Sequence, residues 1–388
     1  MTRLVATSRT IALGIGATGL LALPLALDVR IARVAQPLTG AWRSIPVTRR
    51  RSTLLGISFR PPQVEAFGLE AQPVLQTLLE YPFQIIRLGA YWNRIEMAPG
   101  AFDPGELDRQ IEAAEQSGKQ IILCVGALKC FGYPEFFAPP HHLARSLPEH
   151  ALIGLDSHPA LLAAATEFII RIVERYTSHS SIVAWQVENE AVDPLGIEHS
   201  WRLAAAFIAK EVEAVRRADP SRPILMNGFL PPTLPGQIAQ WWQTRDQGDS
   251  LTVAQHLADI VGIDYYPRYA VAAFGPTAVY LDGTKRRWAR RRVRKLLAAT
   301  RGRQRLMISE GQAEPWEVTT IPPNLPATAM ASCRPEEVIT NYNACLDWFA
   351  ADPSPYAYLF WGAEYWMLRE QSGDSSYLQA FARILEQS

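Results

Sequence analysis

Two segments of the chain end on carboxylates although their apolar residues predict buried strands. The first is VAWQVENE (183–190), which ends on Asn189 and Glu190, and the second is LMISEG (306–311), which contains Glu310. Burying an unpaired carboxylate is costly unless a partner or a shifted pKa compensates for it. Two carboxyl groups that face one cleft can cleave a glycosidic bond without a metal or cofactor. One of them must hold a proton and the other must stay ionised, which requires different environments.

The carboxylates must be positioned by the strands and helices of the chain, and the sequence predicts eight strands separated by helices. Short apolar segments with β-branched residues occupy 54–59, 84–91, 120–127, 181–190, 222–228, 260–267, 304–311 and 357–366. Helical periodicity lies between them, clearest at 159–176 and at 200–219, where we expect Ser200 to be the N-cap. Near-continuous apolar strands are typical of a parallel sheet covered by helices, so the pattern predicts an α/β fold, a (β/α)8 TIM barrel.

A doubly wound open sheet is the alternative fold. Such a sheet would be expected to carry a Gly-rich phosphate turn after its first strand, and RPPQ (60–63) is not one. In the barrel, the carboxyl ends of the strands form the active face, so Glu190 on strand four and Glu310 on strand seven would share one cleft. Arg87, at the end of strand two, is placed to keep one carboxylate ionised.

Other acidic residues near these two strand ends must be weighed against them. Because side chains alternate along a strand, we expect Glu188 to point the same way as Glu190 but deeper, as a structural polar residue. Glu314 and Glu317 follow Gly311 in a predicted loop, which favours Glu310.

From about Gly56 onwards the chain resembles the clan A glycoside hydrolases, and is most similar in style to the family 5 cellulase-like enzymes. The motifs that carry the resemblance are WQVENE, LMISEG, IIRLGAYWNRIEMAPGAFD (85–103), VGIDYYP (261–267) and LFWGAEYW (359–366). The resemblance implies a retaining hydrolase of β-linked oligo- or polysaccharides that works by double displacement. Glu190 would be the acid/base and Glu310 the nucleophile.

The resemblance also implies supporting roles. Asn189 would bind the sugar 2-hydroxyl, Arg87 and Tyr266 would contact the nucleophile, and the reacting sugar would stack on Trp361. Asp264 departs from the pattern, because related enzymes often carry Asn or His at this place on strand six. A catalytically inactive carbohydrate-binding barrel is the main alternative, and a barrel enzyme that uses a metal or phosphate is a third.

Composition limits the classes of molecule that we expect this protein to bind. The chain has 388 residues and a formal net charge of zero, which gives no support for nucleic-acid binding. Its four cysteines lack CxxC spacing and are predicted to be free thiols. The only adjacent histidines, His141 and His142, are expected to be polar loop residues rather than metal ligands. A carbohydrate substrate, with no metal and no cofactor, is therefore the expected partner.

The N-terminal region differs from the rest. Residues 10–27 carry no charge and follow Arg3 and Arg9, which predicts a signal peptide or a membrane anchor. The absence of a clean cleavage site favours an anchor, so we expect a secreted or membrane-anchored protein that could associate with membranes through residues 10–27. Residues 28–51 are predicted to be a basic, Pro-containing tether and 52–388 the hydrolase domain. The basic run 285–305 predicts an outer helix, with contact to an anionic membrane surface as the alternative.

Overall fold

Eight parallel strands close into a barrel in the computed structural model, which describes residues 29–388 apart from 34, 37, 144–146, 195–200, 275–276, 285–286, 301–302, 317–328, 331 and 351–352. The strands, which are hydrogen-bonded in chain order, are β3 (Leu54–Ser58), β4 (Ile85–Gly89), β5 (Gln120–Cys124), β7 (Ile182–Gln186), β9 (Ile224–Phe229), β10 (Ile260–Tyr265), β13 (Arg305–Gln312) and β15 (Ala357–Trp361). Each overlaps one of the eight predicted segments, and the predicted (β/α)8 barrel is confirmed.

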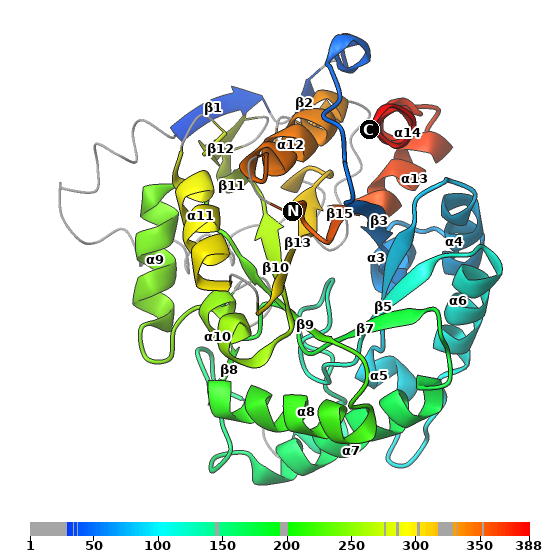
Figure 1. The fold of residues 1–388 in the computed structure, drawn as a ribbon, viewed down its shortest axis with the longest axis vertical. Helices are drawn as coiled ribbons and strands as arrows, with labels where there is room; N and C mark the ends of the chain where they lie inside the picture. The colour runs from blue at the N-terminus through cyan, green and yellow to red at the C-terminus, as the bar shows by residue number, and fades with distance from the viewer. Residues whose placement is uncertain are drawn as a thin grey trace.

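Helices surround the barrel (Figure 1). They are α3 (Pro61–Ala66), α4 (Ala71–Leu79), α5 (Trp92–Ile95), α6 (Gly105–Gln116), α7 (Pro159–Tyr176), α8 (Ala205–Ala218), α9 (Leu234–Thr244), α10 (Ser250–Leu257), α11 (Trp288–Thr300), α12 (Pro335–Trp348), α13 (Ala363–Gln371) and α14 (Ser376–Gln387). The predicted helix 159–176 coincides with α7. The basic run contains α11, on which Arg290, Arg291, Arg294 and Lys295 are exposed, as expected of an outer helix.

The helix predicted at 200–219 begins later than expected. It ends before Pro220 as predicted, but it starts at Ala205, and Ser200 lies outside the described residues. The reason is a competing use of the backbone. The amide of Arg202 donates to the Ala151 carbonyl at 2.9 Å, within the short pairing of β6 (Leu152–Ile153) with β8 (Arg202–Leu203). Arg202 and Leu203 adopt the extended backbone of a strand, so the helix can begin only after them.

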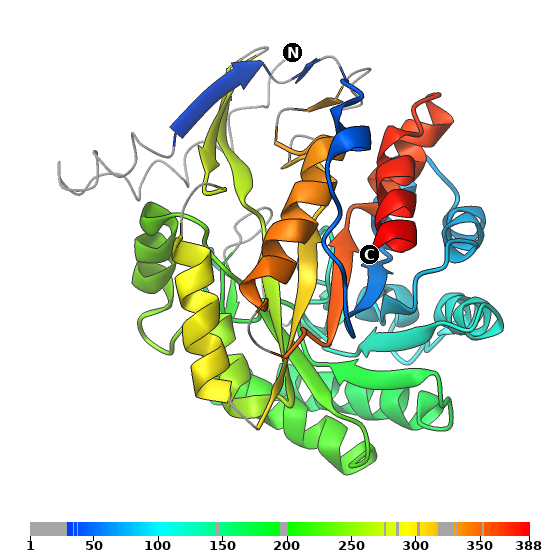
Figure 2. The same ribbon diagram turned by 45° about the horizontal axis from the view of Figure 1, so that its top comes forward.

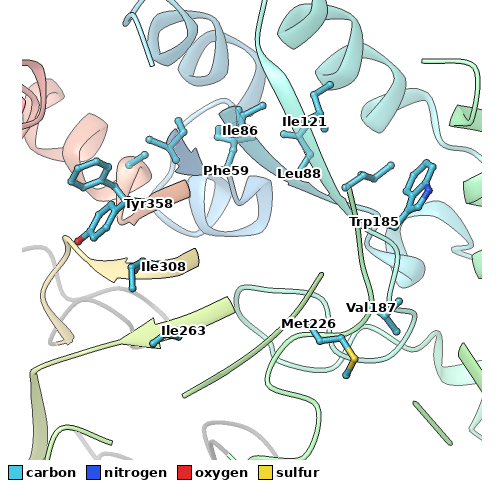
Figure 3. Packing of buried hydrophobic residues seen from close by; sticks show 14 of the residues in the cluster. Phe59, Ile86, Leu88, Ile121, Trp185, Val187, Met226, Ile263, Ile308 and Tyr358 are labelled. Atoms are coloured by element: carbon cyan, nitrogen blue, oxygen red, sulfur yellow. The ribbon is translucent and has the colours of Figure 1, made fainter. Parts of the chain in front are cut away.

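Alternate strand residues build two apolar layers. Successive side chains of a strand point to opposite faces. One set lies inside the barrel and takes one residue from most strands, including Ile85, Ile122, Leu225, Ile260 and Met307. The other set packs the strands against the helices; Figure 3 shows part of it, with the labelled Ile86, Leu88 and Ile121 on neighbouring strands. The residues two positions beyond the inner set on each strand must therefore also face the barrel interior.

The segment predicted to be a tether has regular structure. Strand β1 (Val29–Arg33) pairs with β12 (Thr277–Asp282), which pairs in turn with β11 (Arg268–Phe274). Figure 2 shows β1 beside this hairpin, at the edge of the molecule. Further on, β2 (Ala35–Gln36) pairs with β14 (Ala329–Met330), and the short 3-10 helix η1 (Ala41–Ser44) buries Trp42. The described part of 28–51 thus differs from a free tether because its backbone and its tryptophan find partners on the barrel.

No helix within the described residues is long and apolar enough to cross a membrane. The predicted signal peptide or anchor, residues 10–27, lies outside the described residues.

Candidate active site

A ring of buried polar residues lies directly above the inner apolar layer, on the carboxyl-terminal side of six strands. This polar ring consists of Ser58, Arg87, Gln186, Asn227, Asp264 and Ser309. Hydrogen bonds connect its members around the barrel: Arg87 to Ser58 and Gln186, Gln186 to Asn227, and Asn227 and Ser309 to Asp264. Buried polar groups need such partners. The ring therefore gives the site above it a rigid floor.

Glu310 is held by two groups from other strands. The Arg87 guanidinium donates to Glu310 Oε1 at 2.7 Å, and the Tyr266 hydroxyl donates to Oε2 at 2.5 Å. Burial alone would lower the pKa of Arg87, but the negative charges of Glu310 and Asp264 outweigh it and raise that pKa. Arg87 is thus a permanent cation that favours the ionised form of Glu310. The structure brings together Glu310 and the two residues expected to contact it, Arg87 and Tyr266.

The segment that carries the other carboxylate is not a strand to its end. Strand β7 stops at Gln186, and Glu188 and Glu190 adopt left-handed backbone conformations with φ of 57° and 46°. The expectation that Glu188 and Glu190 point the same way is therefore wrong, because strand alternation no longer applies. The Glu188 carboxylate instead accepts hydrogen bonds from the amides of Leu128 and Lys129, and it lies close enough to Glu211 of α8 for the two groups to interact.

Close backbone approach shapes this turn. A Cβ at Gly126 would lie 2.0 Å from the Glu188 nitrogen, so only glycine fits there. The Asn189 amide donates to the Lys129 carbonyl at 2.6 Å, and the Lys129 ammonium donates to the Glu190 carbonyl at 2.9 Å. The loop after β5 thus fixes the turn that presents Asn189 and Glu190 to the interior.

Three carboxyl groups meet above the polar ring. One oxygen each from Glu190, Asp264 and Glu310 lie within 4.8 Å of one another, and all three side chains are buried. Burial first, and then the charges of Asp264 and Glu310, raise the pKa of Glu190 well above its usual range. Burial and the Glu310 charge likewise raise the pKa of Asp264. One guanidinium cannot balance three negative charges this close together, so the site favours the protonated form of a carboxyl group.

Hydrogen bonding determines which of these carboxyl groups keeps a proton. Asp264 accepts from Asn227 and Ser309, both at 2.6 Å, which favours its ionised form. Glu190 Oε1 has no hydrogen-bond partner among the described residues. Glu190 and Asp264 are hydrogen-bonded to each other, and this bond lowers the pKa of Asp264. The arrangement favours a proton on Glu190, beside an ionised Glu310.

The Asn189 side chain is oriented by its oxygen. Its Oδ1 accepts from Asn227 Nδ2 at 2.7 Å, and Arg87 Nη1 lies 3.5 Å away. With the oxygen bound on this side, the Asn189 amide nitrogen is the group left to bind a ligand.

Trp361 lines a pocket beside the carboxylates. The pocket is formed by Tyr133, Tyr266, Glu314, Pro315, Trp316 and Trp361. The Arg60 guanidinium lies 4.1 Å from the centroid of the Trp361 ring and pairs with both Glu314 and Glu364. This places an aromatic face at the site, held from behind by a buried cation.

Sequence reasoning missed several of these groups. Asn227, Ser309 and Arg60 were not expected in the site, and Glu314 was expected in a loop outside it. A polar residue at the end of an apolar strand was the available signal for Asn227 and Ser309. Of the other tryptophans near strand ends, Trp316 lines the pocket, whereas Trp92 and Trp366 are fully buried in the core.

Part of the chain matches a known protein family, and its fold matches solved structures. Residues 70–208 match glycoside hydrolase family 42, described as beta-galactosidase. No curated protein sequence matches. Among solved structures, GH5_18 from Streptomyces cattleya in complex with GlcNAc is 13% identical with a TM-score of 0.55, covering 88% of this chain and 82% of that chain. Native xylanase 10B from Thermotoga maritima is 14% identical with a TM-score of 0.53, covering 87% and 96%. These structures share the barrel fold with this chain.

Proposed function

We propose that this chain is a glycoside hydrolase of clan A, which the family match over residues 70–208 and the barrel fold support. It hydrolyses a β-linked O-glycosidic bond of an oligo- or polysaccharide with retention of anomeric configuration. Membership in family 5 stays a prediction. The observation that carries the proposal is the pair of buried carboxyl groups, Glu190 and Glu310, with oxygens within 4.8 Å of one another and unequal environments.

In the first step, a Glu310 oxygen attacks the anomeric carbon while the Glu190 carboxyl group gives its proton to the leaving oxygen. The glycosidic C–O bond breaks, and a glycosyl ester of Glu310 forms. In the second step, the Glu190 carboxylate takes a proton from water, whose oxygen attacks the anomeric carbon and releases Glu310. The raised pKa of Glu190 suits this alternation, because the group must both give and accept a proton near neutral pH.

The separation of the carboxyl groups supports retention. Retaining enzymes hold the two groups about 5–5.5 Å apart, whereas inverting enzymes leave about 6.5–9.5 Å for a water molecule. The Glu190 and Glu310 oxygens within 4.8 Å of one another fall on the short side of this division, which supports a retaining enzyme.

The surrounding groups support a sugar as the ligand. An indole face such as that of Trp361 binds the C–H face of a sugar ring, and the Asn189 amide nitrogen can donate to a hydroxyl oxygen. Two proteins with the same fold carry such ligands in their structures: Manb1-4GlcNAc on a variant of GH5_18 from Streptomyces cattleya, and xylobiose on xylanase 10B from Thermotoga petrophila RKU-1. We infer that this chain also acts on a sugar chain of this kind.

The test is a panel of aryl β-glycosides and β-linked polysaccharides, with the first-formed anomer followed by proton NMR. We expect at least one substrate to give the β-anomer first. A 2-deoxy-2-fluoro glycosyl fluoride of the same sugar should add one glycosyl mass to the peptide that contains Glu310. Release of the α-anomer would overturn retention. Saturable sugar binding without turnover of any substrate would favour the inactive carbohydrate-binding barrel.

A further inference from the structure

A second cluster of titratable side chains lies outside the catalytic site, where two loops of the barrel meet. Glu96 directly follows α5, and His141 and His142 belong to the 3-10 helix η2 (Pro140–His142) in the loop after β5. The Nε2 atoms of His141 and His142 lie 3.2 Å and 3.1 Å from the same oxygen, Glu96 Oε1. One donor atom from each residue lies within 4.8 Å of the others.

We propose that Glu96, His141 and His142 form a structural binding site for a divalent transition-metal ion of the zinc type. Zn–N and Zn–O distances of about 2.0–2.2 Å place two ligands of a tetrahedral ion about 3.3–3.5 Å apart. The two His–Glu distances, 3.2 Å and 3.1 Å, are already close to this separation between two ligands. Two imidazoles and one carboxylate fill three corners, and a water molecule takes the fourth.

The ligands are oriented by a second set of contacts, as metal ligands usually are. Trp92 Nε1 donates to Glu96 Oε2 at 2.8 Å, which leaves Oε1 as the oxygen that faces the histidines. The His142 ring stacks on one side of the Trp92 indole at 4.6 Å, and Phe168 stacks on it at 5.4 Å. Phe168 belongs to α7, so α7 supports the Trp92 indole of α5, which in turn orients the imidazole and the carboxylate.

Charge and access also suit a metal. A carboxylate and two imidazoles supply a net negative ligand set for a divalent cation, and the Glu96 oxygen already faces both rings. The side chains of His141 and His142 are 22% and 24% exposed, which gives an ion a path from solvent. Imidazole nitrogen is a good ligand for zinc and a poor one for Mg²⁺ or Ca²⁺, which prefer oxygen.

An ion at this point would crosslink two loops that form one side of the active-site cleft. The loops are already joined by a hydrogen bond from the Asn93 amide to the Phe137 carbonyl at 2.8 Å, and by one from Tyr91 to the Phe131 carbonyl at 3.0 Å. The Phe131 ring in turn lies 4.1 Å from the Arg87 guanidinium. The metal would therefore stabilise the fold and the cleft wall, without taking part in the reaction.

The experiment uses the full chain without a polyhistidine tag, stripped with chelator and then titrated with Zn²⁺. Calorimetry should give one saturable site, and Tm should rise by at least about 2 °C when free Zn²⁺ is about a hundred times its Kd. Mg²⁺ and Ca²⁺ at the same concentrations should leave Tm unchanged. A wild-type protein that shows neither saturable Zn²⁺ binding nor a Tm shift would overturn the proposal.

Variants test the assignment of the ligands. His142→Phe keeps a ring for Trp92 to stack on, and Glu96→Gln keeps the acceptor for Trp92, so both should fold. Each should weaken Zn²⁺ binding at least about tenfold and abolish the metal-dependent Tm shift. The matched control is His158→Phe, because His158 is hydrogen-bonded to Ser157 away from the cluster. If either ligand variant binds Zn²⁺ as tightly as the control, the site is not at these residues. Should either one fail to fold, His141→Ala gives the same test at a position that does not stack on Trp92.

Discussion

The carboxyl group of Asp264 lies within 4.8 Å of that of Glu190, and both side chains are buried at the carboxyl end of the barrel. The charge of Asp264 is, after burial, the largest contribution that raises the pKa of Glu190. In the proposed reaction, Asp264 would therefore act through Glu190, as a positioning residue that keeps the proton on the proposed general acid.

Replacing Asp264 by Asn should move the alkaline limb of the kcat/KM profile to lower pH. The amide removes a neighbouring negative charge, so the pKa of Glu190 falls and its proton is lost earlier. Asn can still accept from Asn227 and donate to the Ser309 oxygen, which preserves the fold. A pH profile of kcat/KM from about pH 4 to about pH 10 measures the shift. An alkaline limb that stays in place or moves upward would contradict the coupling.

Glu310→Gln should lower kcat at least about a hundredfold, because it removes the nucleophile. Arg87 can still donate to the amide oxygen, and the Tyr266 hydroxyl can turn to accept from the amide nitrogen. Binding of substrate, measured by calorimetry, should change little. Glu310→Asp is the companion variant. It retains the negative charge that Arg87 requires but withdraws the oxygen from the anomeric carbon, and should be similarly impaired. The exposed Glu370→Gln serves as control and should match wild type. More than about a tenth of wild-type activity in Glu310→Gln would remove Glu310 from the nucleophile's role.

Glu190→Ala should slow the cleavage of natural glycosides far more than that of aryl glycosides with a good leaving group, since the latter need no proton. Added azide should restore turnover of the aryl substrate and yield a glycosyl azide. The small anion replaces the water that Glu190 would have activated. Equal losses for both substrate types, with no rescue, would show that another residue supplies the proton.

The stability of the folded chain should depend on Glu190 above mildly acidic pH. The ordinary pKa of its carboxyl group is 4.5 and the folded-state pKa is raised, so the folded state binds the proton more tightly. The favourable contribution is complete below pH 4.5 and is lost as pH rises through the folded-state pKa. Glu190→Gln should therefore gain Tm relative to wild type, and the gain should grow from about pH 5 to about pH 9. A Tm difference that stays constant over this range would contradict the prediction, and Glu370→Gln again provides the control.

The sequence was sufficient for the barrel because its strands are long enough, and apolar enough, to be distinguished from the helices between them. The ends of the elements were harder. Strand β7 stops at Gln186 because the backbone of Asn189 pairs with Lys129, a contact across the fold that no local pattern contains. The start of α8 was wrong for a similar reason, since β8 uses the residues expected in its first turn.

Residues of the candidate site could be predicted where a single polar residue ends an apolar strand. They could not be predicted where their importance depends on a network of contacts between strands. Glu310 and Arg87 stand at the ends of apolar runs and could be paired by topology alone. Arg60 and Glu314 are 254 residues apart, and their ion pair behind Trp361 becomes visible only when β13 and the first barrel strand are brought together. Asn227 and Ser309 are short polar residues within apolar strands. They matter because both donate hydrogen bonds to Asp264, which neither one adjoins in sequence.

The left-handed conformations of Glu188 and Glu190 have an evolutionary consequence. Each costs about 1–2 kcal/mol relative to glycine, and Glu190 adds the cost of a buried carboxyl group. Random mutagenesis screened for heat resistance alone would thus enrich Gly at position 190, and so discard activity. A mutant library built for greater heat resistance should leave residues 188–190 unchanged. In a lineage without selection for activity, we expect these positions to be substituted first.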